Sequence, residues 1–138
     1  MNLYFFSWQR ANRYVAAIVV AIFVPGATGI RAAEEQPPTI SIQMGDYRFS
    51  PDEISVAAGQ TVHLELHNTD TLTPHNFTLK EKTAGLDVDV DVGAGKTRTV
   101  EFVPQWPGSY TFFCNKKLPF MKSHRDRGMT GTLIVTPH

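Results

Sequence analysis

The C-terminal part of the chain reads GSYTFFCNKKLPFMKSHRDRGMTGTLIV over residues 108–135. Its two ends, Ser109–Phe113 and Gly131–Val135, are rich in aromatic and β-branched residues, which favours short β-strands. Between them lies Cys114, the only cysteine of the chain. We therefore expect two strands joined by a long loop that carries the single thiol.

Similar short segments recur upstream. Thr61–His67 alternates apolar and polar residues with a period of two, which indicates a half-buried strand. Further strand-like segments are separated by turn residues and span 39–44, 53–56, 76–79, 87–92 and 97–102. The three aspartates of 87–92 are expected to be ordinary solvent-facing side chains, and a short helical turn is expected within 80–85. This pattern predicts an all-β fold, a Greek-key sandwich or barrel of about seven to eight strands.

The N-terminal residues have a different composition. Arg10 and Arg13 precede an apolar run, Tyr14–Val24, which ends at Pro25 and is followed by small residues. This layout is typical of a secretory signal peptide. The run is shorter than the roughly 20 residues that span a bilayer; an uncleaved anchor is the alternative. We predict a signal peptide at residues 1–33 with cleavage near 29–33, a flexible lead-in at 34–38, and one domain at 39–138.

The net charge and the single cysteine limit the classes of function that fit this chain. The whole chain has a net charge of zero, and from Glu34 onward 10 Lys+Arg and 13 Asp+Glu give 10 − 13 = −3. Neither value points to nucleic acid. We expect a periplasmic or otherwise exported protein with no stable membrane span after the leader is removed. A single cysteine cannot form an internal disulfide, so Cys114 needs a chemical role or a buried position.

Further motifs accompany the cysteine. His124 follows Cys114 after nine residues, and Met129 follows after four more. Upstream, residues 73–77 read TPHNF, with His75 after a polar loop. With these motifs, the predicted domain resembles the cupredoxin, or blue copper, family of plastocyanin and azurin. The match also includes Tyr47-x-Phe49-x-Pro51, Gly59-Gln60 and Asn68-x-Asp70.

The resemblance implies a site for one copper ion. Its ligands would be His75, Cys114, His124 and Met129. Two imidazoles and a thiolate suit both Cu(II) and Cu(I), and a weak axial thioether tunes the reduction potential. By the same resemblance, Asn76 is expected to hydrogen-bond to the cysteine-bearing strand and hold the two loops together.

The loop between Cys114 and His124 is longer than is usual in the family. It contains Met121, a second thioether and an alternative axial ligand. The pattern His124-x4-Met129-x-Gly131 matches the family and favours Met129. By the same likeness, His124 is expected to be exposed and to be the port through which electrons pass.

The loop also predicts a surface for a redox partner, possibly an acidic one. Apolar side chains there are surrounded by basic ones, an arrangement that can steer an oppositely charged protein. An ordinary solvated loop is the alternative. The residues concerned are Lys116, Lys117, Leu118, Phe120, Lys122, Arg125 and Arg127.

The resemblance implies an exported, monomeric type 1 copper protein that transfers single electrons between redox partners. The alternative is a periplasmic copper-binding chaperone or resistance protein, which the long loop and Met121 favour. An enzyme is not expected, because the chain is too short for a second copper domain and has no His-x-His pair. A binuclear centre of the terminal-oxidase kind would need a second cysteine.

Overall fold

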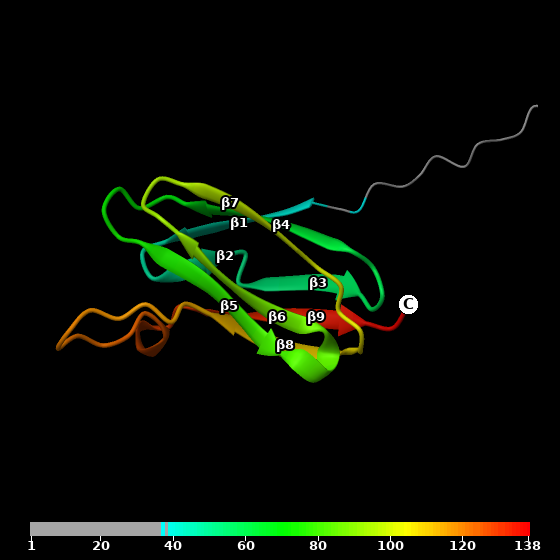
Figure 1. Cartoon of the computed structure of the whole chain (residues 1–138). Helices are drawn as coiled ribbons and strands as arrows, with labels where there is room; N and C mark the ends of the chain where they lie inside the picture. The colour runs from blue at the N-terminus through cyan, green and yellow to red at the C-terminus, as the bar shows by residue number, and fades with distance from the viewer. Residues whose placement is uncertain (1–36, 38) are drawn as a thin grey trace, which may run out of the picture. The chain divides into compact units, whose positions relative to one another are not determined.

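Nearly all of the regular secondary structure in the described part of the chain consists of short strands. The structure is a computed structural model and describes residues 37 and 39–138, so the predicted signal peptide lies outside the described residues. Two sheets face each other (Figure 1). Across residues 37 and 39–138, no helix has the length and apolar character needed to cross a bilayer.

Residues 39–138 contain nine strands, four in one sheet and five in the other. The first sheet has the order β2 (Arg48–Ser50), β1 (Thr39–Gly45), β4 (Val62–Asn68) and β7 (Thr97–Phe102). The second has the order β3 (Glu53–Ala57), β9 (Thr130–Thr136), β8 (Gly108–Phe113), β5 (His75–Glu81) and β6 (Leu86–Val92). Two single-turn 3₁₀ helices, η1 (Lys82–Ala84) and η2 (Arg125–Arg127), interrupt the connections.

The predicted all-β sandwich is confirmed, including the short helical turn now seen as η1. The count of seven to eight strands missed β2, which is only three residues long. Two neighbouring pairs, β1 with β4 and β3 with β9, are parallel. Parallel neighbours need a connection of a dozen or more residues. The first pair meets this requirement, because residues 46–61 connect β1 to β4.

The core lies between the two sheets and follows the alternation in the sequence. Leu64 and Leu66 of β4 are fully buried, as the period of two requires. Three aromatic rings form its centre: Phe77 stacks on Phe112 with centroids 4.9 Å apart, and Phe49 meets Phe112 edge-on at 5.1 Å. Phe77 belongs to β5, which begins with His75, and Phe112 belongs to β8, which leads into Cys114.

Candidate metal centre

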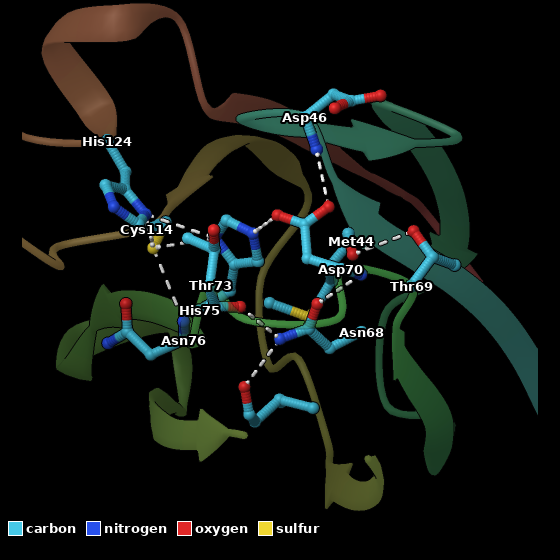
Figure 2. A network of polar contacts seen from close by, with 11 residues as sticks. Met44, Asp46, Asn68, Thr69, Asp70, Thr73, His75, Asn76, Cys114 and His124 are labelled. Carbon is cyan, nitrogen blue, oxygen red and sulfur yellow. Dashed lines mark hydrogen bonds and ion pairs between the residues drawn. The ribbon is translucent and has the colours of Figure 1, made fainter. Parts of the chain in front are cut away.

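Three potential ligand side chains meet at one end of the second sheet (Figure 2). His75 is the first residue of β5, Cys114 directly follows β8, and His124 directly precedes η2. The antiparallel register pairs Thr78 with Phe113 and therefore places the end of β8 beside the start of β5. Strand pairing thus brings together side chains that are far apart in the sequence.

The donor atoms of these three residues form a small triangle. His124 Nδ1 lies 3.1 Å from His75 Nδ1 and 3.3 Å from Cys114 Sγ, and the third side is 3.9 Å. A first-row metal ion lies about 2.0 Å from a nitrogen ligand and about 2.3 Å from a thiolate, so such donors are roughly 3.5 Å apart. His75 and Cys114 are fully buried, and His124 is 5% exposed. The triangle therefore fits one transition-metal ion, and copper suits two imidazoles with a thiolate.

The two candidate axial methionines have different surroundings. Met129 is fully buried in the core, whereas Met121 is 42% exposed. The Met129 amide donates to the carbonyl of His124, and its own carbonyl accepts from the Cys114 amide. The backbone of Met129 is thereby fixed to two of the three clustered residues, which is not true of Met121.

Burial shifts the pKa values of two of these side chains, Cys114 and His124. Burial raises the pKa of the Cys114 thiol, although the Asn76 amide that donates to Sγ at 3.3 Å opposes this. Burial also lowers the pKa of His124, and His75 nearby lowers it further. Neutral imidazole is the form that binds metals. A metal bound here must displace the thiol proton, so its affinity rises with pH.

The side chain of Asn76, the second residue of β5, links the start of the long loop to strands β5 and β6. Its side-chain Oδ1 accepts from the Asn115 amide at 2.8 Å, next to the candidate ligand Cys114. Its Nδ2 donates to Asp89 and to Thr78, each at 2.9 Å. Both the oxygen and the nitrogen of the Asn76 side-chain amide are therefore hydrogen-bonded, and the side chain fixes the end of β8 that leads into Cys114.

The aspartates of β6 are exposed, which confirms the expectation that they face solvent, and two of them also make specific contacts. Asp89 accepts from Asn76 beneath the candidate site. Asp91 forms an ion pair with Lys116 at 2.7 Å. The acidic edge strand thereby holds both the Asn76 network and the first part of the long loop.

Two further residues, for which the sequence pattern predicted no role, contact the cluster. Asp70 Oδ2 lies 2.9 Å from His75 Nε2. The Tyr47 ring meets the ring of His124 edge-on, with centroids 4.8 Å apart, and that of His75 at 6.1 Å. Both were visible only as parts of family motifs, because nothing in their spacing places them beside a histidine.

The expected exposure of His124 was wrong. Its side chain is nearly buried beneath a small hollow at the surface. Side chains of the long loop line this hollow, and the His124 amide donates to the carbonyl of Lys116, which draws the ends of the loop together. The hollow is lined by Tyr47, Leu118, Met121, Lys122, His124 and Arg127.

The basic residues of the loop fall into two groups. Lys116 is paired with Asp91, and the guanidinium groups of Arg125 and Arg127 lie 4.2 Å and 4.4 Å from the ring centroids of Phe113 and Tyr47. The other two, Lys117 and Lys122, are exposed and pair with no acidic group in the described part of the chain. The apolar residues Leu118 and Phe120 are also exposed.

Comparison with known proteins agrees with this architecture. The family model of the cupredoxin-like domain matches residues 14–135. The chain therefore belongs to the cupredoxin family.

Individual relatives are more distant. Plastocyanin of Dryopteris crassirhizoma is 28% identical over 102 residues, covering 67% of this chain and 92% of that protein. Reduced auracyanin from Roseiflexus castenholzii is 27% identical with a TM-score of 0.58, covering 72% of this chain and 97% of its own. Auracyanin A from Chloroflexus aurantiacus, described as a "blue" copper protein, is 25% identical with a TM-score of 0.56, covering 72% and 99%.

Proposed function

We propose that this chain is an exported type 1 copper protein that transfers single electrons between redox partners. Copper would be held by His75, Cys114, His124 and, as the axial ligand, Met129. The observation that carries the proposal is the buried triangle of two Nδ1 atoms and one Sγ, with sides of 3.1, 3.3 and 3.9 Å. Bound copper would supply the chemistry by alternating between Cu(I) and Cu(II), gaining or losing one electron.

The surrounding residues suit an ion that changes charge with little rearrangement. Two members of the triangle, His75 and Cys114, lie at neighbouring strand ends, and the backbone amide of Asn76 donates a hydrogen bond to Cys114 Sγ. Tyr47 packs against both imidazoles and limits their rotation. A fixed, buried ligand set with a thiolate favours electron transfer over substrate chemistry, and supports a carrier rather than an enzyme.

The first test is the visible absorption spectrum of the purified protein after addition of Cu(II). We expect an intense thiolate-to-copper band, and we expect Cys114→Ser to abolish it, because an alcohol does not replace the thiolate as a ligand. Met121→Leu is the control and leaves the band unchanged, whereas Met129→Leu shifts it. A colourless wild-type protein would contradict the proposal, and a shift confined to Met121→Leu would assign the axial position to Met121.

The exposed part of the long loop is proposed as the surface that receives an acidic redox partner. Lys117 and Lys122 provide its free positive charge, and Leu118 and Phe120 its apolar contact. His124 lies beneath the hollow that this loop lines, which gives a short path from the surface to the site.

This surface predicts a charge-dependent rate of electron exchange. In the double variant Lys117→Gln/Lys122→Gln, oxidation of the reduced protein by anionic ferricyanide should slow about fivefold at low salt, because steering by positive charge is lost. The difference should vanish at high salt. Lys80→Gln/Lys82→Gln removes the same charge near the other end of β5 and serves as the control in stopped-flow measurements. If both double variants slowed equally, electrons would not pass specifically through the surface formed by the long loop.

Copper handling remains the second candidate function, favoured by one observation. The thioether-bearing Met121 is 42% exposed and lines the hollow above His124. A soft ligand at this place suits capture or release of Cu(I). This function predicts rapid loss of Cu(I) to a competing chelator, slowed by Met121→Leu, whereas a carrier retains its copper through repeated redox cycles.

A further inference from the structure

We propose that Asp70 positions the His75 ligand and lowers the reduction potential of the centre; this rests on the proposed copper site. Asp70 lies in the loop between β4 and β5, outside the four predicted ligands. Its carboxylate contacts the far side of the imidazole ring from the cluster (Figure 2). The residue would therefore act on the metal through His75.

The geometry at His75 selects one form of the ring. Its Nδ1 faces His124 and Cys114, and its Nε2 lies 2.9 Å from Asp70 Oδ2. A carboxylate only accepts hydrogen bonds, so the proton of the neutral ring resides on Nε2. Nδ1 is then left with a lone pair directed toward the cluster. Carboxylates commonly orient metal-binding histidines in this way.

Asp70 itself is held on several sides. Its second oxygen, Oδ1, accepts from the Asp46 amide at 3.2 Å. Its own amide donates to Asn68 Oδ1 at 3.0 Å, and its carbonyl accepts from the Gly95 amide at 2.9 Å. The side chain is only 19% exposed. The carboxylate is therefore fixed against the ring and partly shielded from water.

A fixed negative charge distinguishes the two copper states. Cu(II) carries one more positive charge than Cu(I), so a nearby carboxylate stabilises the oxidised state more. The hydrogen bond also makes the imidazole a more basic ligand, which acts in the same direction. Neutralising Asp70 should therefore lower the ratio of the Cu(II) affinity to the Cu(I) affinity about tenfold. For a one-electron couple, a tenfold change in this ratio makes the reduction potential about 59 mV more positive.

The first experiment measures the reduction potential of copper-loaded Asp70→Asn by spectroelectrochemistry. Asp46→Asn is the matched control, because Asp46 is an exposed acid in the adjacent turn, does not contact His75 through its side chain, and asparagine tolerates its positive φ of 48°. We expect a rise of about 59 mV, a tenfold change in the affinity ratio, for Asp70→Asn and little change for the control. No rise, or an equal rise in both, would overturn the tuning role.

The second experiment needs neither copper nor a folded variant. Nitrogen-15 NMR of the wild-type apoprotein should show His75 as the Nε2–H tautomer with a slowly exchanging ring proton. An Nδ1–H tautomer would overturn the positioning role. If copper gives no thiolate band in the wild-type protein, the proposed electron-transfer function fails, while this spectrum still decides what Asp70 does to His75.

Discussion

Replacing Asn68 with alanine should lower the free energy of unfolding of the apoprotein by about 3 kcal/mol. Asn68 is fully buried at the end of β4. Its Nδ2 donates to the carbonyls of Thr73 and Val92 at 2.9 and 3.0 Å, and its Oδ1 accepts from the Asp70 amide. Alanine leaves these three groups without that partner, and a buried polar group left unpaired costs about 1–3 kcal/mol.

The loss should also weaken copper binding, since the loop that Asn68 holds contains Asp70 and leads into His75 (Figure 2). Chemical denaturation of the apoprotein measures the stability, and titration with Cu(II) measures the binding. Gln60→Ala truncates an exposed amide and should change stability by less than about 0.5 kcal/mol. A stable Asn68→Ala protein with unchanged copper affinity would show that the loop keeps its conformation without this side chain.

The second large effect is expected for Gly131→Ala, again about 3 kcal/mol of lost stability. A Cβ at this position would overlap the ring of Phe112 and lie 2.6 Å from the carbonyl oxygen of Asp52. Phe112 cannot move aside, because it is fully buried between the rings of Phe49 and Phe77. The carbonyl of Asp52 is also fixed, since it accepts from the Thr132 amide at 2.7 Å.

Thermal and chemical denaturation would test this prediction. Gly93→Ala is the control: its φ is not positive, and the nearest atom to an added Cβ is a lysine side-chain carbon at 3.6 Å. Gly131→Ala should cost less stability in a Phe112→Leu background than in the wild-type protein, because leucine is smaller than phenylalanine and leaves room for the added Cβ. The comparison is between the double variant Gly131→Ala/Phe112→Leu and Phe112→Leu alone. If Gly131→Ala were as stable as the control, β9 would have to move relative to β8 at little cost.

Gly131 illustrates how much the sequence predicted. The motif His124-x4-Met129-x-Gly131 indicated the family, and alternation predicted the strands that the structure contains. Alternation works because one face of each strand is buried, and each face follows every second residue. It could not reveal β2, which has only three residues, or the parallel pairing of β1 with β4.

The long loop was the least predictable part of the candidate site. Its length was evident, but its path was not, because no periodicity constrains an irregular segment. His124 was expected at the surface and lies under the loop, while Met121 is partly exposed. Lys116 and Arg127 belonged to one predicted basic surface, yet they contact Asp91 and Tyr47.

By itself, the sequence determined the kind of fold and the chemical identity of the cluster. Strand alternation is a local property, and a thiol and imidazoles at motif positions are readable one residue at a time. Only the tertiary structure decided that Asp70 meets His75 and that Asp89 supports Asn76. These contacts join different strands and loops, and their partners are selected by the pairing of the sheets and by the need of each buried polar group for a hydrogen bond.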